Sequence, residues 1–127
     1  MALIEEAVRS LLSGLASGRI YPYKLPQGVA LPACTYMKVS APRDHTQQGP
    51  SGLVSARIQV SSWGNAYDDA KTLSDAVRQA LDGYMGTTDG VYIGGVQLVN
   101  ETDLSEPEPA IFQTAMDFKV LHGEQIA

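Results

Sequence analysis

The sequence has very little of the chemistry that small enzymes and secreted domains depend on. Its 127 residues include one cysteine, Cys34, so the chain forms no internal disulfide. It has two histidines, His45 and His122, and their spacing matches neither a metal site nor a catalytic triad. Cys34 falls in an alternating apolar segment, where an inert packed thiol is more common than a nucleophile. We therefore expect no catalytic residue, no cofactor and no metal.

Long apolar runs and an excess of positive charge are also missing. No run approaches the roughly 20 apolar residues that span a bilayer, so we expect no membrane role. Glu5 and Glu6 stand where a signal peptide carries positive charge, which predicts a protein made in the cytosol. The net charge of −5 argues against non-specific nucleic-acid binding, because that binding depends on Lys and Arg at phosphates.

The segment from Gly52 to Tyr84 carries the strongest structural signal. Its first part alternates apolar and polar residues, which predicts a strand buried on one face. After Trp63 the period changes to that of an amphipathic helix. Asn65 is expected to cap this helix and Gly83 to end it. The apolar positions are Val54, Ala56, Ile58 and Val60 in the strand and Ala66, Ala70, Leu73, Val77, Ala80, Leu81 and Tyr84 in the helix.

The remaining periodicities complete a single domain over residues 1–127. A first helix covers residues 3–15, and further strands are predicted at 33–40, 91–98 and 110–122. Residues 19–32 read as a connector with at most a short edge strand, Gly94-Gly95 as a β-bulge, and 101–109 as a solvated connection. We predict an α+β fold in which two helices pack on one face of a mainly antiparallel four-stranded sheet with a long β-hairpin arm.

Three surfaces of this fold are candidate interfaces. The polar segment 41–51 is longer than ordinary hairpin loops, so it is either a mobile tip or an arm that contacts a partner. The first helix has a broad apolar arc, which either wedges between the sheet and the second helix or is covered by a neighbouring subunit. The outward face of the central strands carries mixed charges. The candidate interface residues are Arg43, Asp44, His45, Gln47, Gln48, Leu3, Leu12, Arg57 and Lys119.

Two other motifs carry weaker signals. Glu101, Asp103, Glu106 and Glu108 could hold a hard cation, but they lack the spacing and central glycine of a calcium loop. Gly94-Gly95 is not a phosphate loop, because a strand rather than a helix follows it.

The hairpin and the elements after it resemble a known family. The residues are Ser40-Ala41-Pro42-Arg43-Asp44, Gly49-Pro50-Ser51-Gly52-Leu53, Ser61-Ser62-Trp63, and the helix with Ala70, Leu73, Ala76, Val77 and Leu81. Together with the order of elements, they are similar to the small tail-completion, or tail terminator, proteins of long-tailed phages and prophages. The similarity runs from about Glu5 to His122.

The resemblance implies a protein without catalytic activity that acts in virion assembly. It implies a ring, typically a hexamer, at the head-proximal end of the tail tube, formed in the host cytoplasm. The implied partners are other copies of the chain, the tail tube protein and the head connector, with DNA passing through without specific binding.

Two other classes of protein stay open. One is a small ligand-binding or regulatory domain with a pocket lined by Tyr21, Tyr23, Trp63 and Tyr84. The other is a minor hydrolase that uses His45 and Asp44.

Overall fold

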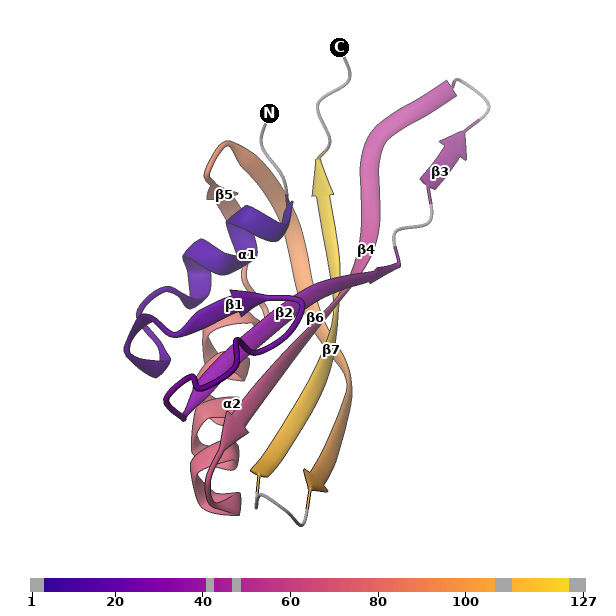
Figure 1. Ribbon diagram of the computed structural model, residues 1–127. Helices are drawn as coiled ribbons and strands as arrows, with labels where there is room; N and C mark the ends of the chain where they lie inside the picture. Colours follow the sequence, from indigo (N-terminus) through magenta and orange to yellow (C-terminus); the bar gives the residue numbers. More distant parts are fainter. Residues whose placement is uncertain (1–3, 41–42, 47–48, 107–110, 124–127) are drawn as a thin grey trace.

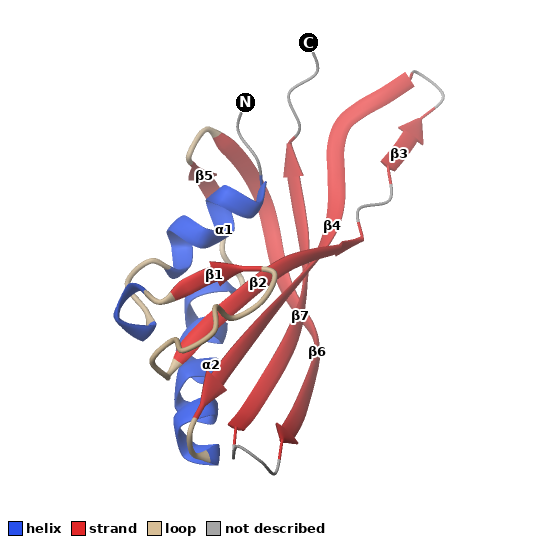
Figure 2. Cartoon of the chain, in the orientation of Figure 1, coloured by secondary structure: helices blue, strands red, loops and turns tan. Residues whose placement is uncertain are grey.

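The computed structural model describes residues 4–40, 43–46, 49–106 and 111–123, with side chains described outside 43–53 and 105–106. Among these residues, two α-helices and a short 3-10 helix accompany one sheet. Figures 1 and 2 show how these elements are arranged. In chain order the elements are α1 (Ile4–Leu12), η1 (Ala16–Gly18), β1 (Ile20–Pro22), β2 (Ala33–Ser40), β3 (Arg43–Thr46), β4 (Gly49–Gly64), α2 (Tyr67–Leu81), β5 (Gly86–Thr88), β6 (Val91–Glu106) and β7 (Ile111–Gly123).

The sheet has seven strands and mixed pairing. Its order is β1-β2-β4-β7-β6-β5, with β3 paired to β4 outside this path. β1 runs parallel to β2, and the other pairs are antiparallel. The predicted four-stranded, mainly antiparallel sheet is therefore wrong, although the α+β class holds. β1 is the short edge strand allowed for residues 19–32, while β3 and β5 were not predicted. These strands have only three or four residues each, too few to show a clear alternation.

The sheet curls around the helices, and one core fills the space between them (Figure 1). A hydrogen bond from the Ser10 hydroxyl of α1 to Asp89, beside β5, joins α1 to one edge of the sheet. Phe118 and Ile58 on neighbouring strands are register partners, and both are buried in the core. Leu12 of α1 and Val77 of α2 belong to the same cluster. Both helices therefore lie on one face of the sheet. No described helix covers the other face, which is called the open face below.

α2 is shorter than predicted and begins without the expected cap. Its N-cap is Ala66, and no side chain caps it there, so the assignment of Asn65 as the cap is wrong. The helix ends at Leu81, and Gly83 follows with a φ of +83°, as predicted for a left-handed exit. The Gly83 amide then donates a 2.8 Å hydrogen bond to the Val96 carbonyl, which fixes the helix end to β6.

β6 is the element that departs furthest from expectation. The predicted bulge is present, because the register shifts between Ile93 and Gly95. The strand then continues to Glu106, so the solvated connection predicted for 101–109 is wrong over 101–106, and 107–110 lie outside the described residues. A second register shift between Leu98 and Asn100 turns the following odd-numbered residues toward the helices. There the carboxylates of Glu101 and Asp103 form ion pairs with one cation on α2, Lys71.

The hairpin between β2 and β4 is an arm with its own strand pairing. In β3, Arg43 pairs with Val54 and His45 with Pro50. Figures 1 and 2 show that β3 and the first part of β4 project away from the helices and the rest of the sheet. The arm therefore presents backbone that packs little against the core.

Candidate interaction surfaces

The open face of the sheet carries a polar centre built from β4 and β7. Asp117 accepts hydrogen bonds from Arg57 Nη2 at 3.0 Å and from Gln59 Nε2 at 3.2 Å. Arg57 and Lys119 are register partners on the two strands, and both are exposed. Two of the cationic residues predicted for an interface are therefore adjacent on one surface.

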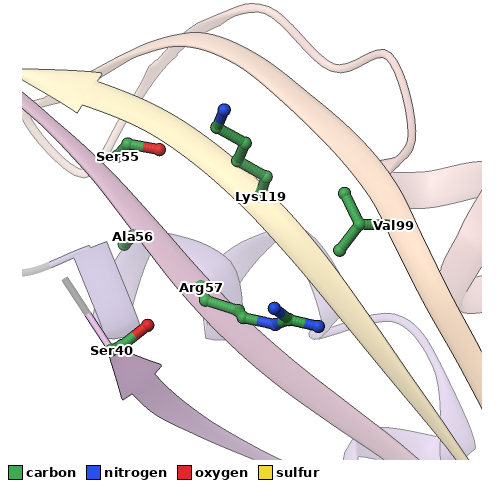
Figure 3. Close-up of a pocket in the computed structure, with 6 residues that line it drawn as sticks. All are labelled: Ser40, Ser55, Ala56, Arg57, Val99 and Lys119. Carbon is green, nitrogen blue, oxygen red and sulfur yellow. The ribbon is translucent and has the colours of Figure 1, made fainter. Parts of the chain in front are cut away.

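A hollow of about 250 Å³ lies at this centre. It collects residues from four strands: Ser40 of β2, Arg57 and its neighbours on β4, Val99 of β6 and Lys119 of β7 (Figure 3). The remaining lining residues are Ser55 and Ala56. The two hydroxyls and two cationic side chains at this hollow can bind a carboxylate or another anion. Ser55 could be found from the sequence, because it lies two positions before Arg57 and so on the same face of the strand. Ser40 and Val99 lie on other strands, and only the register of the sheet shows that they are close to Arg57.

A second hollow, of about 320 Å³, lies where the end of α1 meets α2. Leu12, a predicted interface residue, is fully buried in the chain's own core beside this region, so its side chain is not at the surface. Most apolar residues of α1 are therefore buried within the chain itself, as expected if the helix is wedged between the sheet and the second helix. Leu15 is half-buried and lines the hollow, while Leu3 lies outside the described residues. The lining is completed by Gly14, Ala16, Pro32, Asp69, Thr72, Leu73 and Ala76.

The acidic segment of β6 forms an ion-pair network with α2. Lys71 Nζ lies 3.2 Å from Asp103 Oδ1 and 3.5 Å from Glu101 Oε2. Asp103 also accepts hydrogen bonds from the Tyr67 hydroxyl at 3.0 Å and from Thr114 Oγ1 at 3.1 Å. Desolvation would raise the pKa of Asp103, but the hydrogen bonds from Lys71, Tyr67 and Thr114 outweigh it and lower that pKa.

These contacts give the acidic segment a structural role. Within the described residues no group of His, Cys, Asp and Glu side chains could hold a metal ion. Glu108 lies outside the described residues, as does the side chain of Glu106.

Cys34 and His122, two of the residues considered for catalysis, lie far apart. Burial raises the pKa of the Cys34 thiol to about 12, although a hydrogen bond with Ser62 acts in the opposite direction. Cys34 is the register partner of Ser62 on β4, which in turn pairs with Thr114 on β7. His122 lies eight positions further along β7. At about 3.3 Å per residue, that separation is about 26 Å. Cys34 and His122 therefore share no site.

The aromatic residues proposed for a ligand pocket also lie apart. Trp63 is on the open face, where its Nε1 donates a 3.0 Å hydrogen bond to Thr35 Oγ1. Tyr84 packs against the core on the helix side and its hydroxyl lies 2.6 Å from Thr88 Oγ1. Tyr23 is 72% exposed. They do not line one cavity.

The arm residues are placed by their backbone alone. Arg43, Asp44 and His45 lie on β3, with side chains outside the described set, and Gln47 and Gln48 are outside the described residues. The structure thus brings Arg57 and Lys119 together and leaves the arm as a separate surface. Across the described ranges, no helix is long and apolar enough to cross a membrane.

Comparisons with known proteins identify the class to which this architecture belongs. The structure is similar to a chain in a solved assembly titled "Virion of native gene transfer agent (GTA) particle", with a TM-score of 0.79, 16% identity and 94% of each chain covered. At this identity the similarity shows a shared fold. No curated protein sequence is significantly similar to this chain.

A family model gives the assignment at sequence level. The model described as "Tail completion protein gp17" matches residues 2–123, nearly the whole chain. The chain therefore belongs to this family of phage tail completion proteins, which confirms the resemblance seen in the sequence.

Proposed function

We propose that this protein is a non-enzymatic virion assembly protein that completes the phage tail. It forms a ring on the head-proximal end of the tail tube, stops further addition of tube subunits and joins the tail to the head connector. DNA passes through the ring without specific binding. The same chain acts in the host cytoplasm during assembly and in the finished virion afterwards.

The observation that carries this proposal is the family match over residues 2–123. The fold shared with a chain of a gene transfer agent virion supports a role inside such a particle. Two features of the structure fit a ring subunit. The arm of β3 and β4 projects from the body, and the open sheet face and the helix layer offer two different surfaces. Head-to-tail contacts between different surfaces generate closed rings when the rotation per subunit closes.

The surface charge fits passage of DNA. The chain has a net charge of −5, and cationic contacts to phosphates are what would hold DNA in a channel. An acidic ring would therefore let the duplex move.

The experiment that tests this function is complementation of tails made without the protein. We expect such tails to remain unjoined to heads and to vary in length. Purified wild-type protein should restore joined particles, counted by electron microscopy. A matched preparation of heat-denatured protein controls for additives. Tails of normal length that join heads without this protein would contradict the proposal.

A further inference from the structure

The centre of the open face holds two like charges directly opposite each other. Arg57 and Lys119 are register partners on β4 and β7. Such a pair destabilises a sheet unless other groups compensate it. Asp117 compensates Arg57 from the side at 3.0 Å, but Lys119 has no ion pair among the described side chains. Positive charge therefore stands uncompensated beside the 250 Å³ hollow.

The other side of the molecule carries an exposed acidic stripe. Positions four, seven and eleven residues after Asp68 lie along one line of a helix. On α2 this line faces away from the core-facing Leu73 and Val77. Arg78 lies beside the line and pairs with Asp75, which leaves the stripe net negative. The residues of this stripe, all exposed, are Asp68, Thr72, Asp75 and Gln79.

We infer that the open face of one copy binds the acidic α2 stripe of the next copy in the ring, with a carboxylate of the stripe entering the hollow between Arg57 and Lys119. The inference rests on the proposed function, because it assigns the subunit contact of that ring. The two surfaces lie on opposite sides of one two-layer molecule. Repeating the contact therefore builds a head-to-tail series that closes when the rotation allows it.

The electrostatics favour this pairing over two copies meeting by the same face. Open face against open face would bring four cations together, and stripe against stripe would bring carboxylates together. Open face against stripe gives Lys119 an anionic partner, which none of the described side chains of its own chain provides. The hydroxyls of Ser40 and Ser55 at the hollow supply further donors to a carboxylate.

The test is a charge exchange in the complementation assay. The sheet variant carries Arg57→Gln and Lys119→Glu, the helix variant carries Asp68→Lys and Asp75→Lys, and a third protein carries all four changes. A control variant carries Arg9→Gln and Lys24→Glu, which remove the same charge at exposed positions away from both surfaces. Melting temperature and circular dichroism establish that each variant is folded.

We expect the sheet variant and the helix variant each to lose joining by more than about a hundredfold, since like charges placed at an interface cost several kcal/mol. The four-site protein should recover at least about a tenth of wild-type joining, and the control should match wild type. If the sheet variant fails to fold, Lys119→Gln alone replaces it, with an expected loss of joining of about tenfold.

Three other results would contradict either the proposed function or the inferred contact, and they can be told apart. Wild-type protein that does not restore joining contradicts the proposed function itself. With active wild type, full joining by the sheet variant shows that the open face makes no contact and overturns the inference. A folded four-site protein as inactive as its two-site parents means that the open face meets the tail tube, the connector or DNA, which also overturns the inference while leaving the function intact.

Discussion

Gly64 at the end of β4 lies so close to Ala70 on α2 that a Cβ at position 64 would be 2.8 Å from the Ala70 amide nitrogen. The same Cβ would be 2.9 Å from Asp69 Cβ. The absence of a side chain therefore allows the strand to turn directly into the helix. This contact sets how α2, which carries the proposed acidic stripe, is seated on the sheet.

Gly64→Ala should destabilise the fold. Because the neighbouring atom is backbone, the helix must shift, and overpacking of this kind costs about 1 to 3 kcal/mol. Urea denaturation followed by circular dichroism measures the change. Gly14→Ala is the matched control, since nothing described lies within 4 Å of its added Cβ. Equal stability of the two variants would contradict the close contact.

Asp103→Asn should weaken the link between α2 and β6 in a pH-dependent way. The Asp103 carboxylate is 43% exposed, so we expect a loss of about 0.5 to 1 kcal/mol at pH 7. The pKa of Asp103 is lower in the folded protein than its ordinary value of 3.8, so its contribution is present above about pH 4 and is lost as the pH falls through the folded pKa. The difference in melting temperature from wild type should therefore shrink between pH 7 and pH 3. If the difference in melting temperature stays constant with pH, the effect of the substitution is due to packing and not to the charge of Asp103. Glu6→Gln, which removes a carboxylate at an exposed position, provides the control.

Cys34 should resist thiol reagents in the folded protein. Its thiol is fully buried and has a pKa of about 12, so almost no thiolate is present at pH 8. We expect no labelling by a maleimide under native conditions and complete labelling in denaturant. Cys34→Ala should retain tail joining. Rapid native labelling, or loss of joining by a folded Cys34→Ala protein, would reopen a catalytic role.

Shortening the arm should separate folding from function. Deleting Thr46–Gln48 removes one described register pair, Thr46 with Gly49, in an arm that projects from the core, so the melting temperature should stay within about 2 °C of wild type. Joining should fall strongly if the arm contacts the tube or a neighbour. Arg43→Ala should lower joining by about tenfold or more, as loss of a charged hydrogen bond at an interface does. Wild-type joining by the shortened protein would show that the arm is an idle loop.

Long periodic elements could be predicted from the sequence, and short or locally irregular ones could not. The range of β2 was predicted as found, and the bulge at Gly94-Gly95 followed from a change of apolar phase. β1 and β5 have three residues each, too few to show an alternation. β1 pairs with β2, whose residues come later in the chain, while β5 pairs with β6 directly across the turn at Asp89 and Gly90. Glu101 and Asp103 looked solvated because their cation, Lys71, lies some thirty residues earlier.

The candidate surfaces were predicted only in part. Arg57 and Lys119 stood out as outward charges on strands, but their opposition across the sheet is a property of register, which periodicity does not give. Leu12 was placed at an interface because its helix has a broad apolar arc, and the structure instead buries it between the helices and the curled sheet.

The most direct test of tail completion is the position of the protein in the finished particle. Virions carrying a tag at the C-terminus of this chain, labelled with gold and imaged by electron microscopy, should show label at one place, the junction of head and tail. Quantitative mass spectrometry of the same particles should give the copy number of one ring. Label spread along the tube, label at the distal tip, or virions that contain none of this protein would contradict the account.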